Sequence, residues 1–473
     1  MSKYYFGGLL MAKNLVYDIH DRPKFPQMLV FAIQQLLAIM AATITVPMIV
    51  GNGMSISAAL FGAGIGTIIY QLFTKFRSPV FLGSSFAFIG PMLAAFAGAV
   101  GNAALGYLGL ILGAVFAGLV YVVLAAIVKA AGTQWINKIM PAVVIGPTVA
   151  LIGLSLASAA VNDVFSYGGK VTFGLSSYFE MTAATWVSLV CALVTLAVVV
   201  LCSVYGKKMV KLIPFIIGIL AGYVTALVFT IIGNVAGIDS LIVIDFAPFK
   251  ALVDDGVSLS TFLALPDFTF VEATKGLADF EWDYLLTVLI AYVPVAFVVF
   301  AEHLADHKNL STIIDKDLIE DPGLHRTLLG DGVGSMMGAF FGGCPNTTYG
   351  ESVGCVAITR NASVVTITAT AIIAMLVAFI SPFVAFLDSI PGCVMGGVCI
   401  TLYGFIAVSG LKMIQKVDLE DNANLFTTSV ILIPGIGGMA MAIGGKVFIT
   451  PIACALVLGV LTNVVLNKFK KKN

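Results

Sequence analysis

The sequence predicts an all-α polytopic membrane protein built from two inverted repeats of seven spans. Three observations lead to this fold class. Hydrophobic residues make up 59% of the 473 positions and charged residues only 11%, which excludes an ordinary soluble domain. Apolar segments long enough to cross a bilayer recur along the whole chain. Two short stretches rich in Gly and Pro, residues 83–91 and 343–354, interrupt this pattern at matching places in the two halves.

A bilayer core requires about 20 mostly apolar residues per helix, and about fourteen segments qualify as candidate spans. The third is broken, and the tenth is too short to cross as a plain helix. In order, the segments are 28–50, 56–75, 79–98, 103–130, 137–160, 181–204, 210–235, 284–303, 325–342, 345–359, 363–386, 391–411, 424–443 and 446–467.

The distribution of Lys and Arg predicts that both termini are cytoplasmic, because short cytoplasmic loops accumulate cations. The longest connection, residues 236–283, contains nine acidic residues and two lysines and is expected outside. Residues 1–24 lack the pattern of a cleaved leader. Cations gather in the even-numbered connections and the tail, at Lys75, Arg77, Lys129, Lys138, Lys207, Lys208, Lys211, Lys308, Lys316, Arg360, Lys412, Lys416, Lys468, Lys470, Lys471 and Lys472.

Several classes of function find no support in the sequence. The net charge is zero and there is no basic surface interleaved with aromatic residues, so a nucleic-acid partner is not expected. His303 and His307 are four residues apart, but the glutamate of a zinc-protease motif and a third ligand are missing, so no metal and no cofactor are predicted. The seven cysteines show no metal-ligand spacing and are interpreted as reduced apolar residues.

The two broken stretches predict a binding site in the membrane interior. Irregular backbone at this depth is tolerated only where protein buries it or where it lines a polar cavity, an arrangement found in transporters. Residues before Gly83 and Gly350 suit short extended segments that could pair with each other. A helix that starts after each would direct its amides at the bilayer centre and favour a ligand with carbonyl groups.

Acidic residues in the apolar segments are the candidate functional groups, since charge is costly in a bilayer. Glu302 and Asp306 share one helical face, and their mutual repulsion favours at least one of them as a proton carrier. Asp306 and His307 could instead be solvated charges at a cytoplasmic helix end. Glu351 could simply cap the amides of a broken helix, and Asp331 could be a polar strut to a neighbouring span.

Five segments of the chain resemble the nucleobase/ascorbate transporter family, and most closely its bacterial uracil permeases. The similarity runs from about Pro26 onward. It is carried by QQLLAIMAATITVP (34–47), LGSSFAFIGP (82–91), AEHLADH (301–307), DLIEDPGLHR (317–326) and PNTTYGESVGCVAITR (345–360).

The resemblance implies a core domain of spans 1–4 and 8–11 and a gate domain of spans 5–7 and 12–14, with the site between them. The boundaries would be a cytoplasmic N-terminus 1–27, core 28–131, gate 132–235, an extracellular loop 236–283, core 284–386, gate 387–467 and a basic tail 468–473. A homodimer formed through the gate domains is also implied.

The resemblance further implies the roles of individual residues. Glu302 would accept hydrogen bonds from ring NH groups of a pyrimidine, and the main-chain amides of Phe86 and Gly350 would donate to its carbonyls. The remaining predicted binding residues are Glu351, which supports the second face of the ligand, Ser85 and Tyr349, which line the pocket, and Tyr403, which approaches from the gate side.

The expected function is uptake of uracil with protons across the bacterial plasma membrane, by movement of the core against the gate, and not enzymatic catalysis. Glu302, Asp306 and Glu351 are the candidate protonation sites. A purine or xanthine permease of the same family is the first alternative, and an anion exchanger or channel with seven-plus-seven topology is the second. Two positions depart from the family pattern: Gln35 where a histidine is common, and Asp306 where the best-known uracil symporter has a histidine.

Overall fold

The computed structural model describes residues 15–133, 135–136, 141–173, 176–207, 209–254, 256–443 and 447–470. The predicted all-helical membrane fold is confirmed. Among the described residues, nine helices are long and apolar enough to cross a bilayer. Each of the fourteen predicted segments contains a helix or a strand followed by a helix. The first 14 residues, Lys138, Lys208, Lys471 and Lys472, named above for topology, lie outside the described residues.

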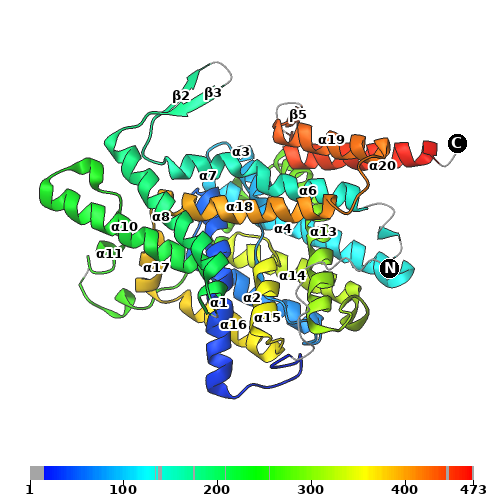
Figure 1. Ribbon diagram of the computed structural model, residues 1–473, viewed down its shortest axis with the longest axis horizontal. Coiled ribbons are helices and arrows are strands. Elements are labelled where there is room, and N and C mark those ends of the chain that lie inside the picture. The colour runs from blue at the N-terminus through cyan, green and yellow to red at the C-terminus, as the bar shows by residue number, and fades with distance from the viewer. Residues whose placement is uncertain are drawn as a thin grey trace, which may run out of the picture.

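Most helices pack within one of two groups. In Figure 1, α1, α2, α15 and α16 lie in the lower part of the view, and α6, α7 and α18 cross its middle. The first helix group consists of α1 (Phe25–Val50), α2 (Ile56–Phe73), α3 (Ile89–Gly98), α4 (Ala103–Ala131), α13 (Trp282–Ile314), α14 (Leu324–Gly342), α15 (Gly350–Thr359) and α16 (Val364–Val377). The second helix group consists of α6 (Ala142–Ser155), α7 (Ala157–Val164), α8 (Ala183–Tyr205), α10 (Pro214–Ala236), α18 (Gly392–Ile414), α19 (Asn422–Ile436) and α20 (Pro451–Lys470).

The two broken stretches meet inside the first helix group. Strands β1 (Leu82–Ser84) and β4 (Asn346–Thr348) pair antiparallel, with Gly83 opposite Thr347. Ser85 N continues the pairing by donating to Pro345 O over 2.9 Å. The pairing satisfies backbone groups that could find no partner in lipid. It therefore brings the starts of two helical segments, one from each half of the chain, close together.

Helix α13 extends well beyond residue 303, where the predicted span 284–303 ends. The helix has 33 residues and ends at Ile314, before Asp315 in a left-handed conformation. His303 and His307 are completely buried in its second half. Their burial excludes a solvated helix end at these positions. The helix continues because neighbouring helices, rather than water, provide the partners of its polar side chains.

Several smaller elements were not expected from the sequence. The predicted fifth span is divided into α6 and α7. Two hairpins occur within the second helix group, β2 (Lys170–Phe173) with β3 (Ser176–Phe179), and β5 (Met441–Ile443) with β6 (Val447–Ile449). The first hairpin projects beyond the helices in Figure 1. The short helices α9 (Met209–Leu212), α11 (Ala247–Ala251), α12 (Thr269–Lys275) and α17 (Ser381–Asp388) lie in connections between the longer ones.

The N-terminal segment 15–24 lies with three of the even-numbered connections on one face of the protein. Val16 N donates to Arg360 O over 2.8 Å, and Ala362 N donates to Tyr17 O over 2.9 Å. Lys316 pairs with Asp18 at 2.6 Å. Arg77 pairs with Asp321 at 2.7 Å, which joins the loop after α2 to the loop after α13. This arrangement agrees with the predicted grouping of these connections on the same side of the bilayer.

Glycines allow α2 and α14 to pack closely at the centre of the first helix group. A Cβ atom at Gly62 would lie 2.6 Å from Gly338 O, and one at Gly342 would lie 2.5 Å from Ala58 O. Both contacts are with backbone, which cannot rotate away as a side chain can. In membranes, where small residues at helix contacts replace the hydrophobic effect as the basis of association, such contacts contribute much of the packing energy.

Gly62→Ala is therefore expected to destabilise the protein by about 1–3 kcal/mol, because the two backbones must separate. Gly404→Ala is the matched control, since a Cβ atom there meets nothing within 4 Å and the residue is helical. Thermal unfolding in detergent, followed by size-exclusion chromatography, measures both variants. Equal melting temperatures for the two would contradict the close packing of α2 against α14.

Candidate functional site

The candidate site is a cavity of about 390 Å³ between the two helix groups. The first group contributes Glu302, Asp306 and Glu351, which all face the same space. The second group contributes aromatic, aliphatic and serine side chains, and the connecting helix α9 contributes the cation Lys211. The lining of the cavity as a whole consists of Ala38, Val149, Ser203, Lys211, Pro214, Phe215, Glu302, Ala305, Asp306, Gly350, Glu351, Gly354, Cys355, Ile358, Phe405, Ile406, Ser409 and Met413.

Helix α13 presents two different polar faces. Glu302 and Asp306 line the cavity, whereas His303 and His307 are completely buried on the side facing the first helix group. The spacing of four residues within each pair places both members on one face. The motif AEHLADH therefore supplies acids to the cavity and histidines to the interior behind it.

The backbone at the start of α15 is the second component of the site. Tyr349 precedes the helix in an extended conformation, and no side chain caps the first amides. Gly350 and Glu351 in this first turn both line the cavity. The 3-10 helix Phe86–Phe88 begins in the same way, after extended Ser85 and without a side-chain cap. Uncapped helix starts provide N–H groups for a ligand with acceptor oxygens.

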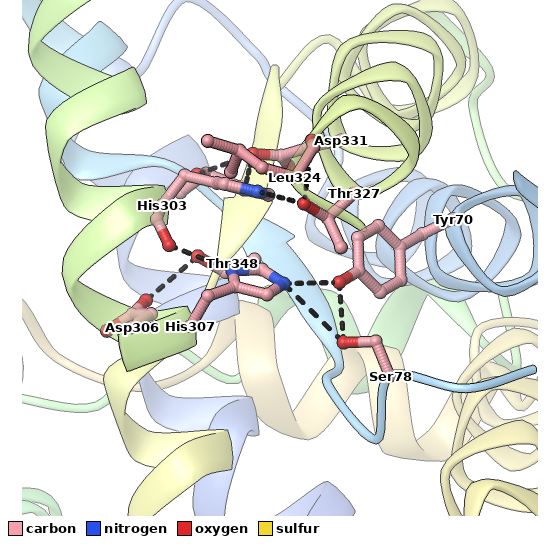
Figure 2. A network of polar contacts seen from close by, with 10 residues as sticks. Tyr70, Ser78, His303, Asp306, His307, Leu324, Thr327, Asp331 and Thr348 are labelled. Carbon is pink, nitrogen blue, oxygen red and sulfur yellow. Dashed lines mark hydrogen bonds and ion pairs between the residues drawn. The ribbon is translucent and has the colours of Figure 1, made fainter. Parts of the chain in front are cut away.

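A buried network of polar contacts supports the histidine face of α13 (Figure 2). His303 Nδ1 lies 2.8 Å from Asp331 Oδ2, and its Nε2 lies 3.0 Å from Thr327 Oγ1. Asp331 and Thr327 both belong to α14. The intramembrane acid Asp331 thus contacts a histidine from a neighbouring helix, which agrees with the structural alternative considered for it above. It is absent from the lining of the cavity.

The second histidine links α13 to α2 and to the segment before β1. His307 Nδ1 donates to His303 O over 2.8 Å, because a carbonyl oxygen can only accept. His307 Nε2 lies 2.6 Å from the Tyr70 hydroxyl, which in turn lies 2.7 Å from Ser78 Oγ. Figure 2 shows these contacts running from His307, next to Asp306, to Tyr70 and Ser78. The histidine ring is therefore fixed at both nitrogens.

Asp306 also contacts the strand of the second break. Thr348 Oγ1 donates to Asp306 Oδ2 over 2.8 Å. Because Thr348 is the last residue of β4, this bond connects an acid of the cavity to the paired strands. A similar connection holds α15, where Ser352 Oγ accepts from Gln35 Nε2 over 2.5 Å and from Phe81 N over 3.1 Å. Gln35, which departs from the family pattern, thus supports the helix that carries Glu351.

Four predicted binding residues do not line the cavity: Phe86, Ser85, Tyr349 and Tyr403. The rings of Phe86 and Tyr403 contact each other with centroids 5.9 Å apart, so they join the first helix group to α18. The Tyr349 hydroxyl donates to Ser84 O over 2.7 Å. Its ring lies so near Gly83 that a Cβ atom there would be 2.2 Å from it. In this structure Tyr349 supports the strand pair.

Sequence reasoning missed the contribution of the second helix group to the cavity. Lys211 was used only to assign topology, and Phe405, Ser409 and Val149 were not considered. Thr348 was treated as a strand residue only. Phe405 lies two positions after Tyr403, but nothing in the sequence distinguishes it from other apolar residues of α18. The one local signal for a role of Thr348 in the site is its position directly before the predicted site residues Tyr349 and Gly350.

Comparison with known proteins gives a consistent result over the whole chain. Residues 26–444 match the model of the Permease family of xanthine and uracil permeases. The uracil permease of Bacillus caldolyticus is 40% identical over 95% of this chain and 94% of its own length. The uracil permease of Bacillus subtilis is 37% identical over 97% of both, and that of Escherichia coli K12 is 35% identical over 90% of this chain and 88% of its own.

Solved structures of other transporters share the fold. The transmembrane domain of the cyanobacterial bicarbonate transporter BicA covers 94% of this chain and 99% of its own, with a TM-score of 0.55 and 13% identity. The murine anion transporter Slc26a9 in its inward-facing state covers 95% of this chain and 69% of its own, with a TM-score of 0.61 and 12% identity. At such low identity the likeness concerns the fold alone.

The hydrogen bond from Tyr349 to Ser84 generates a prediction about stability. Tyr349→Phe should destabilise the protein by about 1 kcal/mol, because a buried hydrogen bond is lost. Tyr292→Phe is the control, since the Tyr292 hydroxyl is buried and has no partner among the described residues. Thermal unfolding should show a lower midpoint for the first variant alone. An equal loss in both variants would mean that the bond to the strand contributes nothing specific.

Proposed function

The chain belongs to the nucleobase/ascorbate transporter family and is a permease, not an enzyme, and from that premise we propose that it carries uracil into the cell together with protons. Relatives named uracil permeases match nearly its entire length. The observation that carries the proposal is the meeting of Glu302, Glu351 and the first turn of α15 in one cavity between the two helix groups. The proposed location is the bacterial plasma membrane.

The chemistry of uracil matches these groups. The ring alternates carbonyl acceptors with NH donors, so a site for it needs both acids and fixed amides. We assign Glu302 as the main acceptor for ring NH groups and the amides of Phe86 and Gly350 as donors to the carbonyls. Glu351 supports the second face of the ligand. Hydrogen bonds to charged groups are stronger than those between neutral groups, which makes the acids the main determinants of affinity.

The rings of Phe86 and Tyr403 close the proposed site on the side where the two helix groups meet. Phe86 and Tyr403 contact each other across the boundary between the helix groups, next to Ser85. In the proposed mechanism the ring of the ligand is accommodated beside Phe86, with Tyr403 approaching from the second group. Ser85 and Tyr349, which lie outside the cavity in this structure, would form its floor near the paired strands once this side is open. Separation of the two groups would open this side.

Transport then requires alternating access of a core domain and a gate domain. We propose that the first helix group is the core, with residues 28–131 and 284–386, and that the second is the gate, with residues 132–235 and 387–467. The polar residues that support the acids all lie in the first group; they are Asp331, Thr348 and Ser352. The first group can therefore move as one body that keeps the acids in place. A homodimer through the gate domains is part of the proposal.

Protons would enter the cycle through the acids of the cavity. Two or three carboxylates in one partly apolar space repel each other, so binding of a proton to one of them favours the loaded state. Glu302, Asp306 and Glu351 are the candidates. Asp306 is the strongest of the three for a role in coupling, since it lies one helical turn from Glu302 and is tied through Thr348 to the paired strands.

Substitution of Glu302 tests the binding role. In proteoliposomes, Glu302→Gln is expected to weaken uracil binding by about 10- to 150-fold, which corresponds to the loss of about 1.5–3 kcal/mol for hydrogen bonds to a charged acceptor. Glu320→Gln, in an exposed connection, is the matched control and should leave binding unchanged. Wild-type affinity in the first variant would remove Glu302 from the site.

Substitution of Asp306 tests coupling. Asp306→Asn should retain exchange of labelled for unlabelled uracil, while accumulation driven by an inward proton gradient falls at least about 10-fold. A protonophore provides the control, because it abolishes the gradient in the wild type. Accumulation that persists in Asp306→Asn but is lost in Glu351→Gln would move the coupling role to Glu351.

Competition distinguishes the substrate from those of related permeases. Unlabelled uracil should reduce uptake of labelled uracil at concentrations where xanthine, guanine and cytosine have no effect. Guanine and cytosine carry an amino group in place of one carbonyl, and xanthine, which has uracil's order of donors and acceptors in its six-membered ring, is larger by a fused imidazole ring. Thymine shares this order and tests the space around the ring. Stronger competition by xanthine than by uracil would assign the protein to purine transport.

A further inference from the structure

A second cavity, of about 520 Å³, lies away from the candidate site, where the N-terminal segment crosses the first helix group. Its walls come from the start of α1, the start of α16 and the turn after α2. The lining residues are apolar except for His20, Arg22 and Thr368. The lining consists of Ile19, His20, Arg22, Met28, Phe76, Val364, Val365, Thr368, Ala369 and Ile372.

The apolar wall of this cavity continues onto the outer surface of three helices. Helix α16 packs against both α1 and α2, so the three helices form one continuous face. Their large apolar side chains are substantially exposed and must face lipid in a membrane protein. These are Leu29 and Ile33 of α1, Leu72 and Phe73 of α2, Phe76 of the following turn, and Ile372 and Leu376 of α16.

The turn after α2 holds Phe76 at the cavity in an unusual backbone conformation. Lys75 and Phe76 both have positive φ, at 54° and 55°. Two consecutive non-glycine residues in the left-handed region are unfavourable and persist only where surrounding structure fixes them. Phe76 N donates to Gln71 O over 2.8 Å, and Arg77 is fixed by Asp321. The turn therefore holds an aromatic side chain at the mouth of the cavity, between two cations.

The polar end of the cavity is cationic. Arg22 and His20 line it; exposed Lys24 follows Arg22 closely in the chain, and exposed Lys75 precedes Phe76. The nearby cations Arg77 and Lys316 are already paired with Asp321 and Asp18. Among the described residues, Arg22 forms no ion pair with an acid. A guanidinium group beside an apolar groove at the end of membrane helices is the arrangement that binds the phosphate of a lipid headgroup.

We propose that this cavity binds an anionic phospholipid of the surrounding membrane. The phosphate lies against Arg22 and His20, and an acyl chain runs from Phe76 along Ile372 and Ala369 toward the bilayer interior. The apolar lining fits the chain and the cation fits the head, so neither a free phosphate nor a neutral lipid satisfies both ends. The site lies away from the residues proposed to bind uracil, and the inference does not depend on the identity of the transported solute.

The bound lipid would secure the N-terminal segment on the first helix group. Ile19 and Arg22 form one wall of the cavity, while Val16 and Tyr17 donate to Arg360 O at the end of α15. The same short segment thus contacts both the lipid site and the helix that carries Glu351. Loss of the lipid should loosen this attachment and lower the thermal stability of the protein.

Native mass spectrometry of the full chain tests the proposal, with phosphatidylglycerol as the anionic probe and phosphatidylcholine as the zwitterionic one. The wild type should retain phosphatidylglycerol at least about 5-fold more than phosphatidylcholine. Arg22→Glu should remove this preference, whereas Lys412→Glu, which reverses an exposed cation on α18, should keep it. Equal retention of both lipids by the wild type, or equal loss in both variants, would overturn the site.

A second variant tests binding of the lipid's acyl chain independently of binding of its headgroup. Ala369→Phe fills the apolar part of the cavity and leaves the polar side chains unchanged, so retention of phosphatidylglycerol should fall while a monodisperse size-exclusion profile shows that the variant is folded. Undiminished retention would show that no acyl chain occupies the cavity. A chain that lacks residues 2–14 should bind the lipid as the wild type does. A rise in retention after this deletion would assign the cavity to the protein's own N-terminal residues instead.

Discussion

The pairing of β1 with β4 is the contact on which the rest of the structure depends. Backbone N–H and C=O groups cannot be left without partners in lipid, so a chain that breaks two of its spans must provide other partners for the backbone groups at the breaks. The short antiparallel ladder between Leu82–Ser84 and Asn346–Thr348 meets this requirement. As a consequence, two uncapped helix starts from opposite halves of the chain come together. The proposed binding groups are thus held together by the same contact that satisfies the backbone at the two breaks.

Helix α13 shows how one sequence motif combines chemistry with support. Its acids face the cavity and its histidines face α14, α2 and the segment before β1. An acid in a membrane needs a defined position, because a small displacement changes both its solvation and its distance from a ligand. The histidines provide that position through contacts to Asp331 and Tyr70. Polar residues of this helix therefore divide into acids that line the cavity and histidines that hold the helix in place.

The fold and the acidic part of the site could be read from the sequence because both follow from strong local patterns. Apolar length marks the spans, and Gly and Pro mark the breaks. Glu302, Asp306 and Glu351 were detectable as charges in apolar surroundings. The cavity residues Phe405 and Val149 were not, since an apolar side chain that faces a cavity looks the same in the sequence as one that faces lipid. The full length of α13 could not be read from the apolar pattern, because the polar residues that extend it resemble a solvated helix end until their buried partners are known.

The hydrogen bonds of Val16 and Tyr17 to the Arg360 carbonyl have a practical consequence for experiments. They attach the N-terminal segment 15–24 to the end of the ten-residue helix whose other end holds Glu351. A bulky affinity tag or fluorescent protein fused directly before this segment would pull on the helix that carries Glu351 through only a few bonds. Fusions at the carboxyl terminus, beyond α20, load the opposite helix group and should disturb the paired strands least.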